Sequence, residues 1–465
     1  MSNDEKPVSV NLAASGRVVL WLAFAAMSTS FAAQAAATPP NILFILTDDM
    51  GCGDLAAYGG TQGSTPHLDR LAREGTRFTQ FYAASPICSA SRTAYTTGMF
   101  PGHWRINSYL QTRAGNRNSE QADWLDPKAP TLARTLKLAG YATAHFGKWH
   151  LGGGRDVQDA PLPSAYGFDE HHVNCEGLGP RFETYGNAKQ PDVYAGKEYY
   201  RYEFTRYWVD RSIDFLRRHQ AQPFYLELWP QDVHTPHTPS EESLTRTAIP
   251  GLPLNQHRFR AVLNEYDRQM GRLLDALRDL GLETNTLVVF AADNGPEPSF
   301  EHARTLGQRG MKWSLYEGGI REPLLVRWPG KIPAGKVNDR TVLSSVDFFP
   351  TLCAIAGVKP PPAAFSGQDM SRAWLGETTA RSRPLLWEYG RKPQGYLYPK
   401  PAGDKSPNVA IRDGNWKLLL NADGTGAELY DLATDPLEAN NLAIQQPERT
   451  QLLAKQALAW RKSLP

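Results

Sequence analysis

The chain of 465 residues has few cysteines, almost no net charge and, after its first forty residues, no long apolar run. Its four cysteines are too sparse and too irregularly spaced for a disulfide scaffold or a zinc motif. A formal charge of +2 without a basic cluster excludes a general role in binding nucleic acid or membrane surfaces. Because no later segment is apolar enough to cross a bilayer, we expect no stable membrane span.

The first forty residues differ in character from the rest. A basic residue, Arg17, precedes the apolar run VVLWLAFAAMSTSFAAQA, and the tripeptide at 33–35 fits a small-residue cleavage site. Polar residues at 28–30 interrupt the run, which disfavours a permanent transmembrane helix. We therefore expect residues 1–35 to be a signal peptide and the mature protein to be periplasmic or extracellular. An uncleaved N-terminal anchor is the alternative.

The cysteines Cys52, Cys88, Cys175 and Cys353 leave two interpretations open. In an exported chain they allow two disulfides with three pairings. Cys88 stands among small polar residues in SPICSASRTAYTTG, whereas Cys353 lies in an apolar segment. Cys88 is either a structural residue, buried or bonded to Cys52, or a chemical group near a helix N-terminus, where anionic character is favoured.

Apolar runs that alternate with amphipathic segments predict a large α/β domain over residues 36–367. Unbroken apolar runs such as NILFIL, YATAHF, PFYLELW and NTLVVFAA are typical of strands buried on both faces of a sheet. Helices are expected between them, most clearly at 258–282, where apolar residues recur at spacings of three and four. The order predicts a large, predominantly parallel mixed sheet with helices on both faces.

The pattern changes after about Gly367. VAIRDGNWKLLL followed by AELYDL predicts antiparallel strands, with tight turns at the Asp-Gly pairs 413–414 and 423–424. PERTQLLAKQALAWRK predicts a closing amphipathic helix. We expect residues 368–465 to form a smaller α+β domain with an antiparallel sheet.

Polar side chains follow four of the predicted strands. They are Asp48 and Asp49, Lys148 and His150, His234, and Asp293 and Asn294. Because the carboxyl ends of strands line the ligand crevice of an open α/β sheet, we expect these groups to face one pocket, together with Lys312.

The chemistry of this set has two parts. Carboxylate and amide oxygens suit Ca²⁺ or Mg²⁺ and not zinc. Lysines and histidines beside a divalent cation suit a tetrahedral oxyanion, with an imidazole moving protons near neutral pH. Taken singly, each residue has a structural interpretation as a helix cap, a turn residue or a packed side chain.

The segment CSASRTAYTTG resembles the signature of the type I, formylglycine-dependent sulfatases, whose core is C-x-(P/A)-x-R followed by a T-G pair. The resemblance extends in order through NILFILTDDMGCGD, TPHLDRLAREGTRFTQFY, GKWHLG, GFDEHH, HTPH, NTLVVFAADNG and YEGGIREPLLVRWPG, nearly the whole mature chain. It implies the alkaline-phosphatase-like sulfatase fold and a sulfuric ester hydrolase of the arylsulfatase type. Ala90 replaces the commoner proline and Met99 a frequent arginine, and neither change removes a catalytic group.

The resemblance also implies a cofactor set. A formylglycine-generating maturation enzyme would convert Cys88 to 3-oxoalanine, whose hydrated gem-diol attacks sulfur and forms a covalent sulfate hemiester. One Ca²⁺ per chain is expected, with Mg²⁺ as the alternative. The matching metal ligands are Asp48, Asp49, Asp293 and Asn294, completed by the modified Cys88.

Catalytic roles follow from the same resemblance. Arg92 would hold the modified side chain and its hydroxyls. Lys148 and Lys312 would neutralise charge on the transferring sulfate. His234 or Lys312 would protonate the leaving alcohol. His150 would remove the proton that releases sulfate and restores the aldehyde.

The substrate class is implied more weakly. GHWRINSYL and HHVNCEGLG resemble stretches of N-acetylgalactosamine-6-sulfatase-like members, which favours a sulfated carbohydrate over another sulfated small molecule. Candidate sugar-subsite residues are Trp104, Arg105, His171, His172 and Asn174. The alternatives are a phosphodiester or phosphonate monoester hydrolase of the same superfamily, a non-catalytic sulfated-glycan-binding protein, and a transferase.

Overall fold

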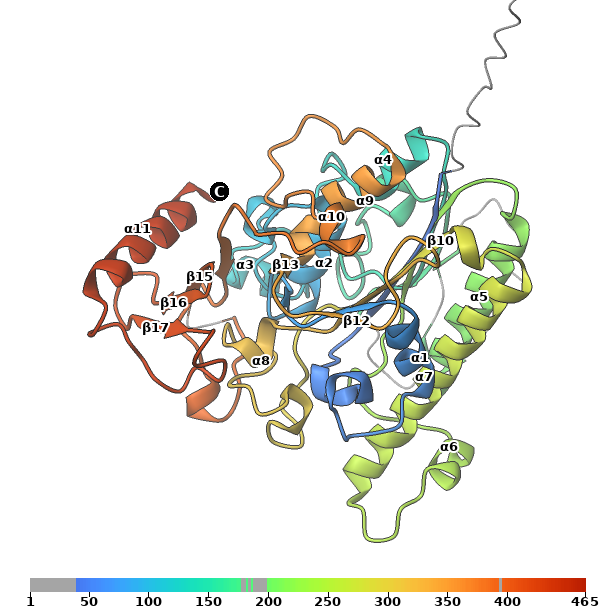
Figure 1. Cartoon of the computed structure of the whole chain (residues 1–465), viewed down its shortest axis with the longest axis horizontal. Coiled ribbons are helices and arrows are strands. Elements are labelled where there is room, and N and C mark those ends of the chain that lie inside the picture. Colours follow the sequence, from blue (N-terminus) through green and yellow to red (C-terminus); the bar gives the residue numbers. More distant parts are fainter. Residues whose placement is uncertain (1–38, 177–180, 183–184, 187–198, 393–394) are drawn as a thin grey trace, which may run out of the picture. The chain divides into compact units, whose positions relative to one another are not determined.

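A nine-stranded mixed sheet forms the main layer of the protein, in the order β12-β2-β11-β10-β1-β9-β4-β5-β7 (Figure 1). In that order the strands span Lys336–Asn338, Thr76–Phe78, Leu324–Arg327, Thr286–Ala292, Asn41–Thr47, Phe224–Trp229, Ala142–Lys148, Glu170–Asn174 and Tyr185–Gly186. The run β10-β1-β9-β4-β5 is parallel throughout, and β11 and β7 flank it in the antiparallel sense. The predicted predominantly parallel mixed sheet is confirmed.

The structure is a computed structural model that describes residues 39–176, 181–182, 185–186, 199–392 and 395–465. The expected signal peptide at 1–35 lies outside these residues. Pro39–Pro465 form one compact unit. Within the described ranges, no helix combines the length and the apolar character that crossing a bilayer requires.

Helices cover both faces of the sheet, as the alternating sequence pattern predicts (Figure 1). On one face lie α1 (Pro66–Glu74), α5 (Phe204–Arg218) and α7 (Leu254–Asp279), and on the other α2 (Cys88–Thr97), α4 (Leu132–Leu138) and α9 (Phe348–Ala356). Alternate residues of β1 point to opposite faces of the sheet. Leu43 packs in the core under α1, α5 and α7, and Phe44 packs in the core under α2, α4 and α9. This double burial explains the unbroken apolar run in the sequence.

A separate four-stranded antiparallel sheet follows, in the order β14-β15-β16-β17. Its strands span Leu385–Glu388, Val409–Asp413, Trp416–Leu420 and Glu428–Asp431, and α11 (Pro447–Ser463) packs on it. Lys417 of β16 bonds Glu317 of α8 (Glu317–Ile320) and Glu438, each at 2.9 Å and fully buried. The antiparallel sheet and closing helix are confirmed, and a domain boundary at 367 stays a prediction.

The remaining strands and α-helices of the described residues are short. They are β3 (Phe81–Tyr82) paired with β13 (Leu343–Ser344), β6 (Arg181–Phe182) paired with β8 (Tyr199–Tyr200), and the helices α3 (Arg113–Asn118), α6 (Glu241–Arg246) and α10 (Ser371–Trp374). All four cysteines are free thiols. None of the three disulfide pairings that the sequence left open is therefore present.

Candidate active site

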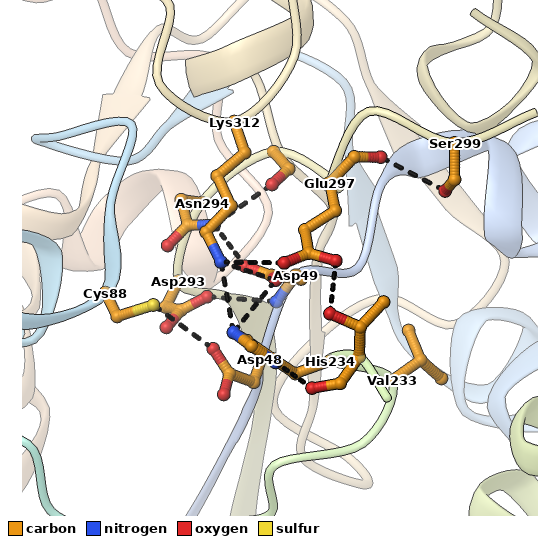
Figure 2. Close-up of polar contacts among 12 residues, drawn as sticks. Asp48, Asp49, Cys88, Val233, His234, Asp293, Asn294, Glu297, Ser299 and Lys312 are labelled. Atoms are coloured by element: carbon orange, nitrogen blue, oxygen red, sulfur yellow. Dashed lines mark hydrogen bonds and ion pairs between the residues drawn. The ribbon is translucent and has the colours of Figure 1, made fainter. Parts of the chain in front are cut away.

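Four parallel neighbours in the sheet, β10, β1, β9 and β4, end at the same edge and bring the predicted polar residues together. The residues at or just beyond these strand ends are Asp293 and Asn294, Asp48 and Asp49, His234, and Lys148 and His150. Figure 2 shows how closely most of these side chains lie, with Lys312 reaching in from a separate loop. The edge of the sheet thus gathers groups that are up to about 250 residues apart in sequence.

Cys88 is the first residue of α2, as expected for a group at a helix N-terminus. Its Sγ lies 3.5 Å from Asp48 Oδ1, and all ten residues of the helix are buried. Burial raises the pKa of the Cys88 thiol well above its usual range, and the nearby lysines only partly offset this. Burial therefore opposes the anionic character expected of a group at a helix N-terminus, and a protonated thiol is a poor nucleophile.

Arg92 lies one helical turn after Cys88 and ties the carboxylates to the helix. Its Nη2 donates to Asp293 Oδ2 at 2.7 Å and lies 3.4 Å from Asp48 Oδ1. Its Nη1 donates to the carbonyl of Lys148 at 3.1 Å, and its guanidinium stacks on Trp229. The Arg92 side chain is fully buried, so its charge interacts with the carboxylates of the site and not with solvent.

Two lysines neutralise the acidic pair at the end of β1. Lys148 Nζ donates to Asp48 Oδ2 at 2.6 Å, and Lys312 Nζ donates to Asp49 Oδ2 at 2.7 Å. Burial works against ionisation, yet these cations hold the pKa of Asp48 well below its usual range and lower that of Asp49. The pKa values of Lys148 and Lys312 are raised in return, by Asp48 and Asp49 against the effect of burial.

Asp293 behaves differently from its neighbours. Burial and the charge of Asp48 raise the pKa of Asp293 to about 7, although Arg92 bonds to it. Asn294 Nδ2 donates to Asp49 Oδ1 at 2.7 Å, while Asn294 Oδ1 is buried and has no partner among the described residues. A cation at this point would stabilise the Asp293 carboxylate and give Asn294 Oδ1 a partner.

A metal ion fits this arrangement. Ligand atoms of Asp48, Asp49, Cys88 and His234 all lie within 4.8 Å of one another. That group shares Asp48, Asp49 and Cys88 with the predicted ligand set and adds His234, while Asp293 and Asn294 each form a hydrogen bond with Asp49. The oxygens of the predicted ligands Asp48, Asp49, Asp293 and Asn294 suit a hard divalent cation.

A pocket of about 210 Å³ opens onto Cys88. Its inner wall is cationic or titratable and comprises Lys148, His150, His234 and Lys312. Arg92 is not part of the lining, because it lies behind Cys88. The pocket therefore presents positive charge and imidazole nitrogens around one buried side chain.

Comparison with known proteins identifies the family. The sulfatase family pattern matches residues 40–358, and the pattern of the N-sulphoglucosamine sulphohydrolase C-terminal region matches residues 310–461. This chain belongs to the sulfatase family. It is accordingly a sulfuric ester hydrolase of the arylsulfatase type, as the resemblance of its signature segment implied.

Two curated relatives cover most of this sulfatase. N-acetylgalactosamine-6-sulfatase of Canis lupus familiaris is 34% identical over 405 residues, which are 80% of this chain and 72% of that protein. N-acetylgalactosamine-6-O-sulfatase of Bacteroides thetaiotaomicron is 30% identical over 493 residues, 88% of this chain and 90% of that protein.

Solved structures share its architecture. The structure of Ps i-CgsB with k-i-k-neocarrahexaose aligns with a TM-score of 0.77 at 25% identity, over 91% of this chain and 93% of that one. A Bacteroides thetaiotaomicron protein of glycosaminoglycan metabolism aligns at 0.74 and 26%, over 90% and 98%. Phosphonate monoester hydrolase of Agrobacterium radiobacter aligns at 0.63 and 20%, over 92% and 96%, and shares the fold.

Several pocket residues of the sulfatase escaped the sequence analysis. They are Tyr109, Arg155, Glu176, Glu297, Trp313 and Leu397. Arg155 and Glu176 form a bidentate pair at 2.7 Å on the rim. These residues lie on loops, where no periodic pattern marks an inward-facing side chain. Only Glu297 could have been suspected from the sequence, because it follows the predicted metal ligands Asp293 and Asn294 by three residues.

His150 of the sulfatase is held in an unusual backbone conformation, with φ of 48°. Its Nε2 lies 3.0 Å from the carbonyl of Leu110, while Nδ1 has no partner in the described part of the chain. Burial and the charge of Lys148 hold the pKa of His150 well below its usual range. Both effects favour the neutral imidazole of His150, and Nδ1 is the ring nitrogen without a partner among the described residues.

The candidate sugar-subsite residues do not line the pocket around Cys88. Trp104, Arg105, His171, His172 and Asn174 are all absent from its described lining. His172 Nδ1 instead contacts the hydroxyl of Tyr207, and Asn174 faces a neighbouring hollow beside Gly152–Gly154. Strand β5 carries three of the five residues, and their burial comes from its place in the sheet.

His171 is expected to make the sulfatase sensitive to acid. Neither of its ring nitrogens has a partner among the described residues, and burial lowers its pKa to about 4. Between pH 6.5, the ordinary value, and pH 4 the unfolded state binds more protons, so stability is complete above pH 6.5 and falls below it. The loss is about 3 kcal/mol at most.

The matching experiment compares His171→Phe with the parent in urea unfolding from pH 4.5 to 8. The variant should lose much of the dependence of unfolding free energy on pH. The control variant His257→Phe, at a partly exposed position of α7, should keep it. An unchanged slope in His171→Phe would contradict the assignment.

Proposed function

We propose that this sulfatase removes sulfate from a sulfated carbohydrate, using formylglycine at position 88 and one bound Ca²⁺. The observation that carries the proposal is the position of Cys88, which lies at the inner end of a pocket between buried carboxylates and buried cations. Burial raises the pKa of the Cys88 thiol, which supports a reagent other than the cysteine itself. Relatives named for N-acetylgalactosamine 6-sulfate support the carbohydrate class.

The proposed Ca²⁺ ligands are Asp48, Asp49, Asp293, Asn294 and the modified side chain of residue 88. The orphaned Asn294 Oδ1 and the raised pKa of Asp293 support this set, because a divalent cation would satisfy both. When bound, the ion and formylglycine supply charge neutralisation and a nucleophilic hydroxyl.

The protein's own cations would bind and orient the sulfate. Lys148 and Lys312 are each anchored to one carboxylate and still line the pocket, so they are preorganised to stabilise charge that develops on the leaving oxygen. Arg92, bonded to Asp293 and to the carbonyl of Lys148, would fix residue 88 from behind.

Two histidines would move protons. His234 Nε2 lies 3.1 Å from Lys312 Nζ, and burial and the Lys312 charge lower the pKa of His234. A proton can therefore pass from Lys312 or through His234 to the departing alcohol. His150, neutral and with an unpartnered Nδ1, would accept the proton whose loss releases sulfate.

The proposal includes maturation and export. Residues 1–35 would direct the chain to a periplasmic or extracellular space and be removed, and a formylglycine-generating enzyme would act on Cys88. Export places the enzyme where sulfated polysaccharides occur.

The test compares purified, matured protein on N-acetylgalactosamine 6-sulfate, 4-nitrophenyl sulfate and a phosphonate monoester. We expect sulfate release from both sulfate esters, and loss of activity in a chelator that Ca²⁺ restores. Dominant turnover of the phosphonate monoester would favour a hydrolase like the Agrobacterium radiobacter protein that shares the fold. Binding of the sulfated sugar without turnover would favour a non-catalytic glycan-binding protein.

A further inference from the structure

Glu297 places a negative charge on the wall of a pocket that otherwise attracts anions. Its side chain is 19% exposed, and the residue lines the same pocket as Cys88 and Lys312. A carboxylate in this place repels the sulfate that the pocket must hold. Its presence requires a benefit that a neutral side chain would not provide.

The two carboxylate oxygens of Glu297 have different surroundings (Figure 2). Oε2 accepts a hydrogen bond from the Thr235 hydroxyl, and the Ser299 hydroxyl donates to the Glu297 carbonyl at 3.1 Å. The Thr235 contact holds the carboxylate, and the Ser299 contact holds the backbone of Glu297. Oε1 lies 3.8 Å from Lys312 Nζ, which is too long for a hydrogen bond.

Lys312 Nζ and Glu297 Oε1 form an ion pair at 3.8 Å, and this distance leaves the oxygen without a hydrogen bond. Its ammonium already donates to Asp49 at 2.7 Å and contacts His234 Nε2 at 3.1 Å. No described residue donates a hydrogen bond to Glu297 Oε1. The oxygen is therefore a fixed, charged acceptor on the pocket wall, and the group that suits it is a hydroxyl or amide N–H of a bound molecule.

We propose that Glu297 Oε1 accepts a hydrogen bond from a hydroxyl or amide N–H of the sugar that carries the sulfate. Glu297 would thereby favour leaving groups that carry a hydrogen-bond donor next to Oε1. It would disfavour leaving groups that carry a second anionic group there. The inference rests on the proposed sulfatase reaction and adds a specificity residue to it. The partly buried aromatic residues Tyr109 and Trp313 give the pocket an apolar surface that suits a pyranose ring.

The test uses Glu297→Gln in the matured full-length enzyme, with two substrates. N-acetylgalactosamine 6-sulfate offers hydroxyl and amide donors, whereas 4-nitrophenyl sulfate offers none. We expect kcat/KM for the sugar sulfate to fall on the order of 10- to 100-fold, mainly through KM, as for a lost hydrogen bond to a charged group. For 4-nitrophenyl sulfate kcat/KM should change by less than about twofold.

Deoxy analogues sharpen the result. The analogue that lacks the donor read by Glu297 should be a poor substrate for the parent and should lose nothing further in Glu297→Gln. Glu301→Gln is the matched control, because Glu301 lies on the same loop, is exposed and is absent from the pocket lining. It should leave both substrates unchanged.

Two outcomes would overturn the inference. An equal loss on both substrates would mean that Glu297 acts through Lys312 and not on the sugar. An unchanged kcat/KM for the sugar sulfate would mean that Glu297 does not contact it. Failure of the parent enzyme to hydrolyse either sulfate ester would instead reject the proposed function.

Discussion

Replacing Cys88 by alanine is expected to abolish sulfate ester hydrolysis, with a loss of at least about 10⁴-fold in kcat. The described side chains around Cys88 are carboxylates, ammonium groups and a guanidinium engaged with one another, together with the imidazoles of His150 and His234. We expect none of them to replace the gem-diol as the nucleophile. The measurement is sulfate release from 4-nitrophenyl sulfate, with the folded state checked by circular dichroism.

Mass spectrometry of the tryptic peptide that contains residue 88 tests directly whether Cys88 has been converted. Conversion of Cys88 to formylglycine should lower the peptide mass by about 18 Da in active preparations. The control Cys353→Ala removes a thiol from the apolar core, so it should cost about 1 kcal/mol of stability and leave kcat unchanged. A fully active preparation with an unmodified Cys88 would refute the proposed mechanism.

Asp48→Asn is expected to remove both the metal and the activity. Asp48 accepts from Lys148 at 2.6 Å and lies 3.4 Å from Arg92, and all three side chains are buried. Loss of its charge leaves Lys148 without an anionic partner, which should cost about 3–5 kcal/mol of stability. We expect kcat to fall on the order of 10³-fold.

The measurements are bound calcium by elemental analysis and the unfolding free energy in urea. Asp54→Asn is the matched control, because Asp54 is equally buried and pairs with Arg304 at 2.8 Å, outside the predicted ligand set. It should lower stability to a similar extent and retain the metal. Retention of one calcium per chain in Asp48→Asn would show that Asp48 is not a ligand.

The strands that carry the site were predictable because they are buried on both faces. The unbroken apolar run from Ile42 to Leu46 is enough to predict a central strand. Asp48, two residues later, marks the edge of the sheet. The helix at 258–282 was equally clear from its spacing, although it begins earlier, at Leu254. The first turn lacks the apolar spacing of the rest of the helix, so its start could not be predicted.

Loop residues were not predictable in the same way. Glu297 and Trp313 reach the pocket through backbone turns, and Trp313 has φ of 72°, a conformation that sequence does not announce. The sugar-subsite residues stay a prediction, and the structure places them outside the lining of the pocket around Cys88. His171 and His172 are polar residues in a strand, and only the packing of α5 and the sheet around them shows that they lie away from the pocket.

The charges at the centre of the site balance before any metal binds. Three buried carboxylates, on Asp48, Asp49 and Asp293, face three buried cations, on Arg92, Lys148 and Lys312. A divalent cation brings the sum to +2, which matches a free sulfate dianion better than the singly charged ester. We therefore expect product sulfate to compete with the substrate for this centre, so that added inorganic sulfate lowers the rate when the substrate is below saturation.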